Sequence, residues 1–110
     1  MSKQIDLVSL HAAADEASRL LKVLANPDRL VLLCQMTQAE LSVKELETTT
    51  GIRQPTLSQQ LTVLREEQLV NARREGKQIF YKIASSEAMA ILQVLYQLYC
   101  RQGHEVFNDD

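Results

Sequence analysis

The feature that most constrains the fold is a short helical segment, a glycine turn and a longer helical segment between residues 42 and 68. Ser42 and Glu45 have the spacing of a capping box, which opens a helix of about two turns. Gly51 suits the turn that follows, because glycine adopts positive φ without strain. Pro55 opens the longer segment, whose inward face is marked by leucines at i, i+4 and i+7: Leu57, Leu61 and Leu64. This order predicts a helix-turn-helix over about residues 43–68.

A β-hairpin is predicted directly after these helices. The run at 78–83 is rich in β-branched and aromatic residues, and Gly76 separates it from the run at 69–74. A hairpin in this place is the wing of a winged helix, here over about residues 70–83. The prediction is therefore a mainly α fold with a β-hairpin, a winged helix-turn-helix in the order α-α-α-α-β-β-α.

The remaining helices flank this unit. Apolar residues at helical spacing predict a helix over about 6–25, and Asn26-Pro27 ends it and starts a second helix that is apolar nearly all round. Ser85 or Ser86 caps a last helix, predicted over about 86–101. Because the first and last helices are apolar, we expect them to form the interface of a homodimer.

Length and composition exclude several protein classes. The chain has 110 residues, which suits a single domain over 1–110, and its two cysteines are too few for a disulfide scaffold. No apolar stretch reaches the ~18 residues of a membrane span, and the N-terminus lacks the pattern of a signal peptide. No catalytic triad or phosphate loop is present. We therefore expect a cytosolic protein that is not an enzyme and holds no cofactor.

Charge is unevenly distributed along the chain. Residues 51–83 hold six basic and three acidic side chains, although the whole chain has a net charge of −2. The basic block coincides with the predicted longer helix and the wing, so we expect it to bind double-stranded DNA. Amide and hydroxyl side chains in the first turns of a recognition helix suit base edges, and basic wing residues suit phosphates. The expected contacts are Arg53, Gln54, Thr56, Ser58, Gln59, Gln60, Thr62, Arg73, Arg74 and Lys77.

Three segments carry a family resemblance. Residues 20–30 (LLKVLANPDRL), 54–61 (QPTLSQQL) and 73–81 (RREGKQIFY) resemble the opening, recognition helix and wing of the ArsR family of dimeric winged-helix repressors. The resemblance implies a transcriptional repressor that binds a pseudo-palindromic operator. Gln60 stands where the family usually has histidine, and Gln68 stands where it often has glycine.

The two cysteines, Cys34 and Cys100, are the candidate sensing residues. Periodicity places both near apolar helix faces, and this leaves open whether they are small buried packing residues or a redox-sensing dithiol. Their positions are similar to those of the BigR/SqrR/HlyU-like branch of the family, and the recognition-helix segment looks closest to the BigR type. This resemblance implies a repressor that releases DNA when reactive sulfur species link the two cysteines by a disulfide or polysulfide bridge. It also implies control of sulfide-detoxification or of biofilm and virulence genes.

A metal-responsive repressor of the same fold is the alternative. The arsenic-type cysteine positions of the family are occupied here by Ser42 and Lys44, and the last helix lacks the donor cluster of the zinc type. Cys34 and Cys100 with His104 and Glu105 offer donors without a supporting ligand spacing. We therefore expect no metal site. A winged helix used only for protein–protein contact is a third hypothesis, and the basic wing argues against it.

Overall fold

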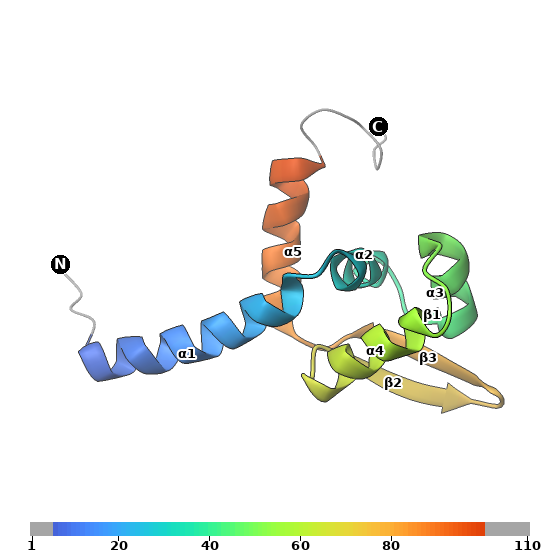
Figure 1. Ribbon diagram of the computed structural model, residues 1–110, viewed down its shortest axis with the longest axis horizontal. Helices are drawn as coiled ribbons and strands as arrows, with labels where there is room; N and C mark the ends of the chain where they lie inside the picture. The colour runs from blue at the N-terminus through green and yellow to red at the C-terminus, as the bar shows by residue number, and fades with distance from the viewer. Residues whose placement is uncertain (1–5, 101–110) are drawn as a thin grey trace.

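A computed structural model describes residues 6–100 of the chain. Its elements are α1 (Leu7–Leu24), α2 (Pro27–Gln35), β1 (Leu41–Ser42), α3 (Val43–Thr50), α4 (Thr56–Glu66), β2 (Val70–Glu75), β3 (Gln78–Ile83) and α5 (Ser86–Tyr99) (Figure 1). The predicted order of helices and hairpin is confirmed. Strand β1 is an addition that the sequence pattern did not predict. Residue 101, the predicted end of the last helix, lies outside the described part of the chain.

The predicted helix caps are present. The Asn26 side chain accepts from the Arg29 backbone N–H at 3.0 Å, and Ser42 and Glu45 form the reciprocal hydrogen bonds of a capping box. Gly51 has a φ of 76° at the end of α3, as its place in the turn requires. Helix α4 is shorter than predicted: it ends at Glu66 because Gln68 adopts a positive φ of 65°, which is incompatible with continuing the helix.

The core is built around α2, which contacts α1, α3, α4 and α5. Leu32 and Leu33 of this helix are fully buried, as are the three inward leucines predicted for α4. The packed residues form one apolar cluster, made of Val23, Leu24, Leu32, Leu33, Met36, Leu46, Leu57, Leu61, Leu64, Leu69, Val70, Tyr81, Ala88 and Leu92. This cluster fixes α4 against α2, so that the opposite face of α4 is presented to solvent.

The three strands form one antiparallel sheet in the order β1-β3-β2. In its register Leu41 pairs with Tyr81, and Arg73 pairs with Phe80. Ser42 has two roles, because it is the last residue of β1, opposite Phe80, and also the N-cap of α3. The wing and the helix-turn-helix are therefore joined through the sheet.

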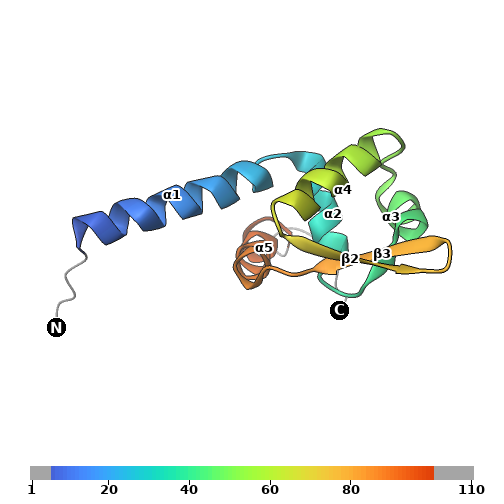
Figure 2. The same cartoon turned by 90° about the horizontal axis from the view of Figure 1, so that it is seen from below.

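Helix α1 projects from this body, as two views show (Figures 1 and 2). Only Val23 and Leu24 at its C-terminal end are buried, whereas Leu7 and Val8 are 64% and 76% exposed. The projection contributes to the radius of gyration of 16.2 Å, against ~13 Å for a compact domain of 100 residues. Within residues 6–100 no helix has both the length and the apolar character needed to cross a bilayer.

Candidate nucleic-acid interface and cysteine pair

The outer face of α4 carries the polar side chains that the sequence singled out. Arg53, Gln54, Ser58, Gln59 and Thr62 are exposed, and Thr56 is half-buried. Gln54 accepts from the Ser58 backbone N–H at 3.1 Å, and the Thr62 hydroxyl donates to the Ser58 carbonyl at 2.9 Å. These local hydrogen bonds leave the Gln54 amide N–H groups and the Ser58 hydroxyl available to a ligand.

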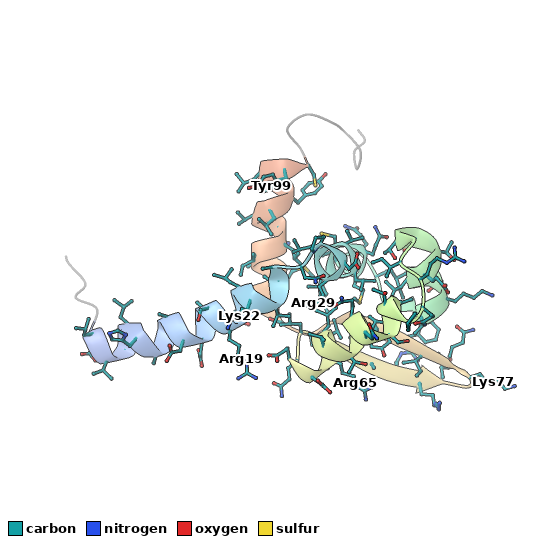
Figure 3. The ribbon with its side chains drawn as sticks, viewed as in Figure 1. Arg19, Lys22, Arg29, Arg65, Lys77 and Tyr99 are labelled. Carbon is teal, nitrogen blue, oxygen red and sulfur yellow. The ribbon has the colours of Figure 1, made fainter. Side chains whose placement is uncertain are left out.

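Gln60 differs from its neighbours because it faces the protein. It is half-buried, and its side-chain oxygen accepts from Nη1 of Arg29 at 2.9 Å. Arg29, on α2, also donates from Nε to the Val23 carbonyl of α1 at 2.6 Å. Figure 3 shows Arg29 between α2 and α4. One guanidinium therefore connects the end of α1, helix α2 and the predicted recognition helix.

The wing holds four basic residues, and Lys82 on β3 joins the three that the sequence singled out as DNA contacts. Arg74 and Lys77 are exposed, and no carboxylate in the described part of the chain pairs with either. Figure 3 places Lys77 at the tip of the hairpin (Figure 3). Arg73 instead forms ion pairs with Glu40 and Glu75. The structure thus brings Arg74 and Lys77 to the wing surface as free cations, and places Arg73 in an intramolecular network.

Sequence reasoning missed two residues of this region, Arg29 and Glu40. Their partners, Gln60 and Arg73, lie 31 and 33 positions further along the chain. No local pattern signals a pairing over that distance, although an arginine in the first turn of a predicted helix and an acidic residue shortly before another are both visible in the sequence. The pairings come from the packing of α2 on α4 and of β1 on β3.

Cys34 and Cys100 are both free thiols, in α2 and at the C-cap of α5. Cys34 is exposed and Cys100 is half-buried, so the interpretation of Cys34 as a buried packing residue is wrong. Its position one turn after Leu30 puts it at the edge of the apolar face. Partial desolvation raises the pKa of the Cys34 thiol, and the negative charge of a Cys100 thiolate raises it further. The two sulfurs therefore lie within range of each other's charge, where α2 contacts α5.

Metal-ligating side chains do not gather into a cluster among residues 6–100. No group of three or more His, Cys, Asp or Glu side chains in that range is arranged to hold a metal ion. His104 and Glu105, and Arg101 beside Cys100, lie outside the described residues. Of the two arsenic-type positions, Ser42 is buried as the α3 cap and Lys44 is exposed, so neither offers a thiolate.

The comparisons with known proteins identify the family. The family model described as "Bacterial regulatory protein, arsR family" matches residues 26–72, from the α2 cap into the wing. The "Biofilm growth-associated repressor" of Agrobacterium fabrum is 50% identical over 97 residues, which cover 88% of this chain and 83% of that protein. The chain belongs to the arsR family. The resemblance of its three sequence segments is thereby confirmed.

Solved structures agree with this assignment. The crystal structure of the transcriptional repressor BigR from Xylella fastidiosa matches with a TM-score of 0.82 and 45% identity, over 89% of this chain and all of that one. A homodimeric winged helix-turn-helix DNA-binding domain from Mycobacterium bovis matches with a TM-score of 0.68 and 34% identity, over 94% and 97%. This arsR-family chain is a DNA-binding transcriptional repressor with the predicted winged helix-turn-helix fold. These relatives are transcriptional regulators and not enzymes, as expected.

Proposed function

We propose that this protein is a homodimeric repressor that leaves its operator when reactive sulfur species link Cys34 to Cys100. The observation that carries the proposal is the placement of an exposed thiol on α2 within charge range of a second thiol at the end of α5. Helix α2 is also the helix that holds the recognition helix in place. A bond between the two sulfurs acts on the central element of the fold.

The DNA-binding surface combines the recognition helix and the wing. The first turns of α4 enter a major groove, where Gln59 is positioned to pair with adenine and short hydroxyl side chains meet bases or phosphates. The exposed cations of the wing lie along the backbone. The proposed contacts are Arg53, Gln54, Thr56, Ser58, Gln59, Thr62, Arg74 and Lys77, with Gln60 supporting the helix from within.

Dimerisation is supported by the apolar surface that the single chain leaves uncovered. Val8 and Leu10 on α1, and Val94, Leu98 and Tyr99 on α5, are large apolar side chains between 46% and 77% exposed. Tyr99 lies at the far end of α5 (Figure 3). Two copies that cover these faces present two recognition helices to successive major grooves of a pseudo-palindromic operator, about 34–36 Å apart.

The proposed chemistry uses an alkyl persulfide, RSSH, as the oxidant. One cysteine thiolate attacks the outer sulfur of RSSH, forms a protein persulfide and releases the thiol RSH. The second cysteine thiolate attacks the inner sulfur of that persulfide, forms the disulfide and releases hydrogen sulfide. The cysteines lose two electrons and two protons in total, and the persulfide is reduced to RSH and H₂S. Further persulfide transfer before closure lengthens the bridge to a polysulfide.

The bond between Cys34 and Cys100 affects the DNA-binding surface through its effect on α2. Closing a bond between α2 and α5 changes the position of α2, and the Arg29 guanidinium transmits that change to Gln60 of α4 and to the Val23 carbonyl of α1. Such a bond lowers operator affinity to the extent that it favours the non-binding arrangement of the dimer. In the cell the regulated genes would be those of sulfide detoxification or biofilm growth.

The test combines intact-mass measurement with operator binding. The reduced protein is treated with glutathione persulfide, diamide or hydrogen peroxide, and then titrated with its operator. Loss of two hydrogens, or that loss with added sulfur, together with operator release is the expected result for persulfide. Cys34→Ser and Cys100→Ser proteins should stay bound. If both variants release DNA like the wild type, the cysteines are not the sensor, and stoichiometric zinc or copper(I) becomes the next effector to test.

A further inference from the structure

Arg73 is the most heavily engaged charged residue of the wing. Its Nε and Nη2 atoms donate to the two carboxylate oxygens of Glu40, each at 2.9 Å, and Nη1 donates to Glu75 at 2.8 Å. All three guanidinium nitrogens therefore hold a carboxylate oxygen. The Glu40 pair is bidentate, the geometry in which arginine binds a carboxylate most specifically.

The path of this side chain crosses the sheet. Arg73 lies on β2 opposite Phe80 of the central strand β3, and its guanidinium carbon is 4.8 Å from the centroid of the Phe80 ring. Glu40 directly precedes β1, on the other side of β3. Arg73 thus passes over the aromatic ring of its cross-strand neighbour and fastens β2 to the chain entering β1. That chain continues through Ser42 into α3.

The charge of this cluster is unsuited to phosphate binding. One guanidinium faces two carboxylates, and the positive charge of Lys82 also acts on Glu40, so these four groups have no excess positive charge to offer a phosphate. The hydrogen bond and charge of Arg73, together with the charge of Lys82, hold the pKa of Glu40 below its usual range, and the hydrogen bonds that Arg73 donates to both carboxylates raise its own pKa. A DNA phosphate would have to displace a bidentate carboxylate to reach Arg73. Arg74 and Lys77, without such partners in the described chain, meet phosphate at no such cost.

We propose that Arg73 is a positioning residue, which with Glu40 fixes the wing against the start of α3, and that Glu40 is therefore a determinant of operator affinity. The sequence had indicated Arg73 as a DNA contact. The inference rests on the proposed contact between the wing and the DNA backbone, and it assigns that contact to Arg74 and Lys77. The unexpected consequence is that Glu40, although acidic, supports binding to the negatively charged DNA.

The sign of the Glu40→Gln effect tests the inference. If Glu40 positions the wing, removing its charge weakens operator binding, by about threefold to tenfold for an exposed bidentate pair. Arg73→Gln weakens binding to the same extent, and the double variant is no weaker than either single variant. Arg73→Lys keeps the charge but not the bidentate geometry, so it should resemble Arg73→Gln. Glu75→Gln, which removes a charge but leaves the Glu40 pair, is the matched control and should not weaken binding.

Fluorescence anisotropy with reduced protein at one fixed salt concentration measures these affinities, and thermal unfolding confirms that each variant is folded. Tighter binding by Glu40→Gln, or wild-type affinity of Arg73→Lys, would overturn the inference and return Arg73 to the phosphate contacts. A combined Arg74→Ala and Lys77→Ala variant tests the contact between the wing and DNA separately from the positioning role of Arg73. If it binds like the wild type, the wing does not contact DNA, and the positioning role falls with that contact.

Discussion

The hydrogen bond between Arg29 and Gln60 predicts that Gln60 supports the recognition helix α4 and does not contact a DNA base. Gln60→Met removes the acceptor while nearly keeping side-chain length and helix propensity. Arg29 Nη1 then loses its 2.9 Å partner in a half-buried site, while Nε keeps the Val23 carbonyl. Losing a hydrogen bond to a charged donor costs ~1.5–3 kcal/mol, and partial solvent access reduces this to about 1–2 kcal/mol.

Urea unfolding followed by circular dichroism measures this loss, at one fixed protomer concentration because dimerisation contributes to stability. With a slope of ~2 kcal/mol/M, the midpoint falls by about 0.5–1 M. Gln59→Met is the matched control, since Gln59 is the exposed preceding residue of the same helix. Its unfolding midpoint should remain close to that of the wild type.

Operator binding supplies the second measurement. Against a panel of operators with single base-pair changes, Gln60→Met should weaken binding by a similar factor for every sequence. Gln59→Met should instead relax the preference at one position, worth about 1–3 kcal/mol for a bidentate base contact. A Gln60→Met protein that unfolds at the wild-type midpoint and loses selectivity at one base pair would refute the reasoning, because Gln60 would then read the DNA.

Three further predictions concern the turn after α4, the thiols and the dimer. Gln68→Gly should raise the free energy of unfolding by about 0.5–1 kcal/mol in urea titrations without changing operator affinity, because Gln68 has a φ of 65°. Alkylation of Cys34 by iodoacetamide should keep accelerating above pH ~8.5, since its pKa is raised, and Cys100→Ser should move the profile to lower pH. Val94→Glu should yield monomers in sedimentation and weaken operator binding, because Val94 is 56% exposed on a face assigned to the dimer.

Much of the fold follows from local sequence signals. The capping box at Ser42, the positive φ of Gly51 and the inward leucines of α4 are each determined by residues within one or two turns of chain, and the structure confirms all of them. Strand β1 was not predicted because two residues carry no detectable alternation. It exists through its pairing with β3, about 40 positions later in the sequence.

The candidate site was predictable in composition but not in detail. The segment that holds the polar helix face and basic wing was visible from residue type and order alone. The internal roles of Gln60 and Arg73 were not, because each depends on a partner more than 30 residues away. The exposure of Cys34, which periodicity had left open, was not predictable either: apolar periodicity shows which face of α2 is buried, but not where that face ends.

Ser42 ends β1 and caps α3, so the sheet that carries the wing and the helix-turn-helix are joined at one residue within each protomer. The distance between the two half-sites of an operator is spanned by two protomers, so in the proposed dimer it is set by how the two copies are held together. One inserted base pair moves the second half-site by ~3.4 Å and turns it by roughly 35° about the DNA axis. The proposed dimer can follow such a change by moving its two copies relative to each other at the apolar faces of α1 and α5, rather than by moving the wing relative to α3 within one copy.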